Sequence, residues 1–195
     1  MQKRNFISLF LLAIACSPAW GHAEAGQVSG FISGVWHPVS GLDHVLAMVA
    51  VGLWGAQLGN PALWLLPVAF PLVMAFGGFL GLVGVPLPGT EIGIALSGVL
   101  LGFAVATRLQ PPLWIATLLV AVFAVFHGHA HGTELPEGAS GLAYSAGFVM
   151  ATGLLHACGI ALGLLQRWPQ GKLVVRGMGC VIGFGGIYFL VGALA

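Results

Sequence analysis

The sequence predicts an all-α fold, a polytopic membrane bundle of about six transmembrane helices that follows a cleaved signal peptide. Of the 195 residues, 58% are hydrophobic and only 6% are charged, against about 25% charged in an average soluble domain. Apolar runs of about 20 residues, the length of a spanning helix, recur along the chain. No segment alternates apolar and polar residues in the way that a membrane β-barrel requires. We therefore expect an integral membrane protein built from helices.

Residues 1–21 have the pattern of a secretory signal peptide. The basic pair Lys3 and Arg4 precedes an apolar stretch, and small residues follow at the spacing that signal peptidase requires. We therefore expect residues 1–21 to be removed and residues 22–195 to form a single six-helix domain.

The position of cleavage decides whether a metal-binding group stands at the mature N-terminus. Cleavage after residue 21 would expose His22, whose free amine and imidazole together chelate a metal, whereas cleavage after residue 23 or 25 would remove it. Acylation at Cys16 and an uncleaved first helix are the alternatives to a cleaved signal.

Six apolar segments follow the leader, each bounded by helix breakers or charges. If the mature N-terminus is exported, the second, fourth and sixth segments end outside. The basic residues of the mature chain then all fall on the inner side, and the glutamates of the connections fall on the outer side, as the positive-inside rule requires. This predicts a multi-pass protein of the bacterial inner membrane with a periplasmic N-terminus. The segments are residues 39–58, 62–84, 91–108, 112–131, 140–165 and 173–194, with Arg108, Arg167, Lys172 and Arg176 inside and Glu91, Glu134 and Glu137 outside.

Small residues within these segments predict how the helices pack. Pairs of glycines four residues apart let helix backbones approach closely in a membrane. We expect Cys158 and Cys180, inside apolar segments, to be buried as small hydrophobic residues rather than paired in a disulfide. The glycine pairs are 55/59, 77/81, 98/102, 159/163 and 179/183.

The fourth segment ends in a polar string, Phe126-His127-Gly128-His129-Ala130-His131-Gly132-Thr133-Glu134. Imidazole suits Ni, Cu, Zn and Fe, and ionisable groups at membrane depth are costly enough to indicate a function. In a regular helix His127 and His131 share a face while His129 points elsewhere, whereas a break at the glycines would let all three converge. Glu134 then serves as a ligand or holds a histidine tautomer. The alternative is an exposed tract that scavenges metal without a pathway.

The first segment opens with a second polar string, Trp36-His37-Pro38-Val39-Ser40-Gly41-Leu42-Asp43-His44-Val45-Leu46-Ala47-Met48. His37 and His44 lie two turns apart on one face if the segment is helical, although a proline and a glycine make its first turn uncertain. Asp43 adjoins His44, and Met48 lies one turn further along, so nitrogen, oxygen and sulfur donors are available together. The alternative is that Asp43 merely complements a helix N-terminus and that the histidines lie in the membrane interface.

A single histidine, His156, lies about two-thirds of the way along the fifth segment, with Thr152 one turn away. It is either a hydrogen-bond donor packed between helices or a second, inner way-station for a metal.

The two strings, His-x5-Asp-His and Phe-His-Gly-x-Ala-His-Gly-x-Glu, resemble the signatures of the HupE/UreJ family of membrane proteins, and the resemblance covers the mature chain. It implies a nickel permease that serves hydrogenase or urease maturation, with some relatives implicated in cobalt. His129 stands at a variable position of the motif. The predicted metal ligands are His37, Asp43, His44, His127, His131 and Glu134, with His22, Met48, His129 and His156 as further candidates.

The sequence thus predicts a secondary permease, not an enzyme, that imports a divalent transition-metal cation and carries no prosthetic group. Nickel is the first candidate, with cobalt and zinc as alternatives that nitrogen and oxygen ligands alone do not separate. A net charge of +1 gives no support for a nucleic-acid partner, and the chain lacks a Gly-x4-Gly-Lys-Ser/Thr nucleotide loop. Two alternatives use the same residues: a zinc-dependent intramembrane hydrolase, and an accessory or sensor protein that binds metal without transport.

Overall fold

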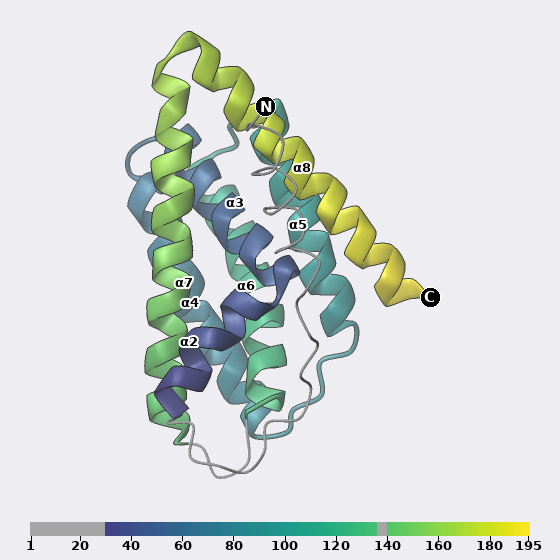
Figure 1. Ribbon diagram of the computed structural model, residues 1–195. Coiled ribbons are helices and arrows are strands. Elements are labelled where there is room, and N and C mark those ends of the chain that lie inside the picture. Colours follow the sequence, from purple (N-terminus) through teal and green to yellow (C-terminus); the bar gives the residue numbers. More distant parts are fainter. Residues whose placement is uncertain (1–29, 136–139) are drawn as a thin grey trace, which may run out of the picture.

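The computed structural model describes residues 30–135 and 140–195. The predictions for the signal peptide, its cleavage site, His22 and Glu137 lie outside these residues. The described part consists of helices connected by short turns, with no strand (Figure 1). In chain order the helices are α2 (Gly30–Ser40), α3 (Leu42–Leu58), α4 (Ala62–Leu82), α5 (Thr90–Thr107), α6 (Leu113–Thr133), α7 (Gly141–Gly163), the 3-10 turn η1 (Leu164–Arg167) and α8 (Pro169–Leu194).

Five of these elements, α4 to α8, are long and apolar enough to cross a membrane, with η1 continuing α7. The pair α2 and α3 makes a sixth candidate span, bent by 81°. The predicted all-α, multi-pass membrane bundle is therefore confirmed. The first segment differs from the prediction, since it begins at Gly30 and is broken at Gly41, whose backbone is extended (φ −92°, ψ 111°).

Helix α3 lies at the centre of the bundle, and its residues from Met48 to Trp54 include several that are fully buried. Helix α4 packs along α6, α5 along α8, and α7 along both α2 and α3, as Figure 1 shows. Because the outer faces of α4 to α8 contact lipid rather than water, they carry many exposed apolar side chains. Cys158 and Cys180 lie on such exposed faces, so the prediction that they are buried was wrong.

Glycines bring the helix backbones together, as their spacing predicted. A Cβ at Gly128 of α6 would lie 1.9 Å from the Met74 carbonyl oxygen of α4, and a Cβ at Gly77 would lie 2.3 Å from the Val125 carbonyl oxygen. The pair 55/59 is the exception: α3 ends at Leu58, and Gly59 (φ 76°) makes the turn that follows. Only glycine adopts that backbone conformation at little cost, so Gly59 closes a turn instead of a helix contact.

The charged side chains of the described residues separate to opposite ends of the bundle. Asp43, Glu91 and Glu134 lie where α3 and α5 begin and where α6 ends. The basic residues lie at the other end, after α5 and around η1 and the start of α8, and are Arg108, Arg167, Lys172 and Arg176. We call these the acidic end and the basic end.

Candidate metal centre

Six ionisable side chains from three parts of the chain meet at the acidic end. We call them the histidine cluster. Ligand atoms of His37, His131 and Glu134 all lie within 4.8 Å of one another, and the other members adjoin them. The structure thus brings together residues from both polar strings of the sequence. The cluster comprises His37 of α2, Asp43 and His44 of α3, His127 and His131 of α6, and Glu134 directly after α6.

The bend at Gly41 places both histidines of the first string against α6. His37 and His44 do not share one helical face, because they lie on helices that meet at 81°. Instead α2 crosses the end of the bundle, and the rings of His37 and His44 approach the ring of His131 from two sides, with centroid distances of 4.7 and 4.6 Å. The break between α2 and α3 therefore brings the members of the histidine cluster together.

Helix α6 continues without a break through the second string to Thr133. His127 and His131 consequently share a face, as predicted for a regular helix, and both are buried. His129 points away and donates its Nε2 hydrogen to the Val85 carbonyl, at 2.7 Å. The two glycines of the string do not interrupt the helix but lie against the backbone of α4.

The cluster forms a row that leads from the surface into the interior. Glu134 lies 3.0 Å from His37 at the exposed end, where their side chains are 53% and 30% exposed. The rings then follow in the order His37, His131, His44 and His127, with 4.8 Å between the centroids of the last two. His127, at the inner end, is 0% exposed.

Oxygen acceptors fix the protons of three imidazoles in this row. The Nδ1 hydrogen of His44 is donated to the Asp43 carboxylate at 2.9 Å, and the Nε2 hydrogen of His37 is donated to Glu134. Ser97 donates its hydroxyl to the Ile94 carbonyl, so its oxygen accepts the Nε2 hydrogen of His127 at 2.9 Å. A neutral imidazole that donates from one nitrogen has a lone pair on the other. Each of these rings therefore keeps one nitrogen available as a metal ligand.

The exposed end of the row is negatively charged. The hydrogen bond from His37 lowers the pKa of Glu134 below its ordinary value of 4.5, although partial burial acts in the opposite direction. Glu134 is therefore ionised at neutral pH and attracts cations to the mouth of the row.

Four residues that line the row were not predicted from the sequence. Ser97 holds His127, the ring of Phe148 lies 4.1 Å from that of His131, and the ring of Tyr144 lies 5.9 Å from that of His37. The ring centroid of Phe70 of α4 lies 5.5 Å from that of His127. A hydroxyl within an apolar segment was a signal for Ser97 and Tyr144, whereas the aromatic rings resemble any other core residue in a sequence.

Two further candidates from the sequence lie deeper in the bundle. Met48 is fully buried in the hydrophobic core. His156 of α7 is also buried, and the centroid of its ring lies 5.4 Å from that of Phe70.

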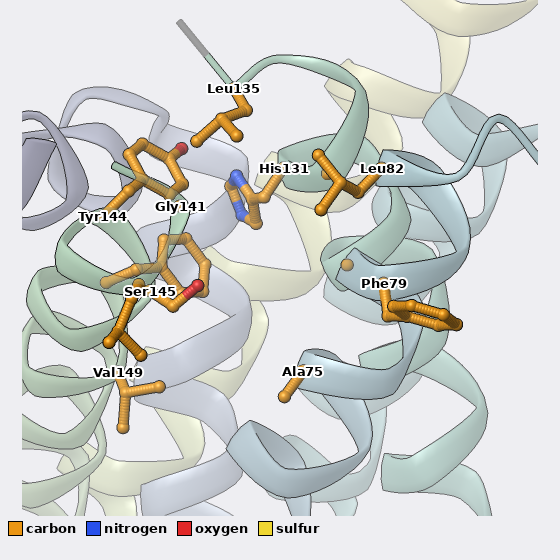
Figure 2. Close-up of a pocket in the computed structure, with 13 residues that line it drawn as sticks. Ala75, Phe79, Leu82, His131, Leu135, Gly141, Tyr144, Ser145 and Val149 are labelled. Carbon is orange, nitrogen blue, oxygen red and sulfur yellow. The ribbon is translucent and has the colours of Figure 1, made fainter. Parts of the chain in front are cut away.

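A cavity of about 370 Å³ adjoins the cluster between α4 and α7. Figure 2 shows the His131 ring between Tyr144 and Leu135 on one side and Leu82 and Phe79 on the other. Most of its lining is apolar, and its polar side chains are those of His131, Tyr144 and Ser145.

Comparison with known proteins extends the sequence resemblance to nearly the whole chain. A family model described as HupE / UreJ protein matches residues 9–189. The chain is also similar to a protein named Protein HupE from Rhizobium leguminosarum bv. viciae, with 44% identity over 192 residues, which cover 98% of this chain and 100% of that protein. No solved structure matches the chain.

Proposed function

The chain belongs to the HupE/UreJ family, and on that premise we propose that it is a secondary permease for a divalent transition-metal cation, nickel first. It imports the ion across the bacterial inner membrane, with the mature N-terminus in the periplasm, and the ion serves the maturation of a hydrogenase or a urease. The acidic end of the bundle is then the periplasmic end.

The observation that carries the proposal is the row of imidazoles from the exposed Glu134 to the buried His127. Neutral imidazole nitrogens are good ligands for nickel, copper and zinc. Metal–nitrogen bonds are about 2.0–2.1 Å long, so two ligands of one ion lie no more than about 4 Å apart. The ligand atoms of His37, His131 and Glu134, spread over 4.8 Å, therefore need only small side-chain rotations to close on an ion.

The shape of the row favours passage over catalysis. A zinc hydrolase gathers its histidines around one ion and keeps one position open for water. Here His37 and His127 stand at opposite ends of the row, separated by the rings of His131 and His44. A series of sites with few ligands each binds an ion firmly enough to admit it and loosely enough to pass it on.

The test is uptake of radioactive nickel in cells that lack other nickel importers. We expect His131→Ala, His44→Ala and Asp43→Ala to lose most uptake at equal abundance in the membrane. His129→Ala is the matched control, since it removes the same side chain from the same string but on the face that bonds to Val85. Normal uptake in all three cluster variants would refute the site. Competition by cobalt and zinc in the same assay measures selectivity.

Purified protein in vesicles separates a permease from a metal-binding accessory protein. A permease accumulates nickel inside vesicles in proportion to the amount of protein. An accessory protein retains the metal but leaves the vesicle interior empty.

A further inference from the structure

A second pair of polar side chains lies below the histidine cluster, on α7. Thr152 and His156 are four residues apart, so they share a helix face, and they are 0% and 1% exposed. Within the described part of the chain, both ring nitrogens of His156 and the hydroxyl of Thr152 lack a hydrogen-bond partner. Buried polar groups are nearly always paired, so we expect these three atoms to bind a partner such as a water molecule or an ion.

The backbone of helix α4 supplies a further oxygen atom that can act as a metal ligand. Pro71 has no N–H, so the carbonyl of Pro67, four residues earlier, lacks the hydrogen bond that a helix normally gives it. This carbonyl interacts with the ring of His156 without reaching hydrogen-bond geometry. The Pro67 carbonyl oxygen of α4 thus lies beside the His156 ring, and the Thr152 hydroxyl lies one turn away on the same face of α7. Such a mixed set suits a divalent transition-metal cation that must be released again.

The ring of Phe70 contacts both His156 and His127, the innermost member of the histidine cluster. It is fully buried, and its centroid lies 5.5 Å from that of His127 and 5.4 Å from that of His156. Phe70 directly precedes Pro71, in a stretch of α4 where two prolines remove helix hydrogen bonds. A helix with missing bonds deforms at lower cost than a regular one. The Phe70 ring therefore lies on a part of α4 that bends at lower energetic cost than a regular helix.

We propose that His156, Thr152 and the Pro67 carbonyl form an inner station for a divalent transition-metal cation, with the ring of Phe70 in contact with both this station and the histidine cluster. The inference rests on the proposed function and deepens it, since an ion that leaves His127 passes the Phe70 ring and is received at His156. The inner station then lies on the way to the basic end of the bundle.

The first experiment measures nickel influx into vesicles that contain the purified full chain and an enclosed nickel-sensitive dye. Thr152→Val keeps the shape of the side chain and removes only the hydroxyl. We expect its maximal rate to fall by about tenfold or more, while the external nickel concentration that gives half-maximal influx stays unchanged. His156→Gln has the same signature, and Thr152→Ser restores the rate. Thr117→Val is the matched control, because the hydroxyl of Thr117 bonds only to the Leu113 carbonyl of its own helix.

Full influx by both Thr152→Val and His156→Gln, at equal folded protein, would overturn the inner station and leave the proposed function standing. A parent protein without influx would instead refute the proposed function. In that case cobalt titration of the purified chain, followed by visible absorption, decides the inner station by itself. We expect the quadruple variant His37→Ala, His44→Ala, His127→Ala, His131→Ala, which lacks every imidazole of the histidine cluster, to keep one bound cobalt ion, and the further change His156→Gln to abolish it. Cobalt binding that survives this change would overturn the inference.

Discussion

Replacing Gly128 by alanine tests whether the close approach of α4 and α6 holds the histidine cluster together. Gly128 lies between His127 and His131 on α6, and an added Cβ would meet the Met74 carbonyl oxygen at 1.9 Å, where real Cβ contacts essentially never fall below 3.0 Å. The obstacle is helix backbone and not a flexible side chain, so α4 and α6 must separate locally by about 1 Å.

The expected cost follows from two opposing contributions. Overpacking of a well-packed interior costs typically about 1–3 kcal/mol, and contact with backbone places this site near the upper end. Alanine in place of glycine within a helix gains about 1 kcal/mol. We therefore expect Gly128→Ala to lose about 2 kcal/mol relative to the parent and about 3 kcal/mol relative to a glycine-to-alanine change in open space. Gly153 of α7 offers that control, since a Cβ there would have nothing within 4 Å.

Thermal denaturation of the detergent-solubilised protein measures the difference. For a chain of this length, about 3 kcal/mol corresponds to a midpoint roughly 6–12 °C lower for Gly128→Ala than for Gly153→Ala. Nickel uptake should fall as well, because the shift moves His127 and His131 relative to His44. Equal midpoints and equal uptake for the two variants would refute the packing argument.

Three further predictions concern the charged and titrating groups. Nickel uptake should decrease as the external pH falls from 7.5 to 5.5, because a protonated imidazole does not bind metal; uptake that stays flat over this range would contradict capture by histidine. Since the pKa of Glu134 is lowered in the folded protein, its pair with His37 stabilises the protein above pH 4.5 and is lost as the pH falls through the lower folded value. The melting temperature of the parent should accordingly exceed that of Glu134→Gln at pH 6 and converge with it as the pH falls below the lowered pKa of Glu134, and a difference that is constant with pH would argue against the pair. Asp43→Asn should weaken nickel binding about 10- to 100-fold, because it replaces the charged carboxylate that accepts the Nδ1 hydrogen of His44 with a weaker, neutral amide acceptor, and an unchanged titration curve would show that Asp43 has no such role.

The fold was predictable from the sequence because the apolar composition of each segment and the helix-breaking residues between segments determine where the spanning helices lie. Apolar segments interrupted by proline, glycine and charge give five of the spans to within a few residues. The break at Gly41 was only half visible: Pro38 and Gly41 indicated an irregular turn, but the bend of 81° depends on how α2 packs across α7.

Within the site, helical periodicity predicted which side chains of a single helix share a face. His127 and His131 share a face and His129 does not, since α6 is regular to Thr133. Contacts between helices were not accessible in the same way. Helices that are apolar all round do not reveal which neighbour each face meets, so the contacts of Ser97 with His127 and of Phe70 with both His127 and His156 required the structure.

The hydrogen bonds that fix the imidazole protons have an electrical consequence. Because Asp43, Glu134 and Ser97 hold the N–H groups of the row, an ion that binds the remaining lone pairs displaces no proton there, and the carboxylates themselves stay in place. If the chain imports the ion as proposed and no counter-ion moves with it, each divalent cation carries two charges across the membrane. An inside-negative potential of about 100 mV favours that movement by about 4.6 kcal/mol, at about 2.3 kcal/mol per charge. This equals roughly a thousandfold concentration ratio, so the resting voltage of a cell is itself sufficient to drive accumulation along the proposed path.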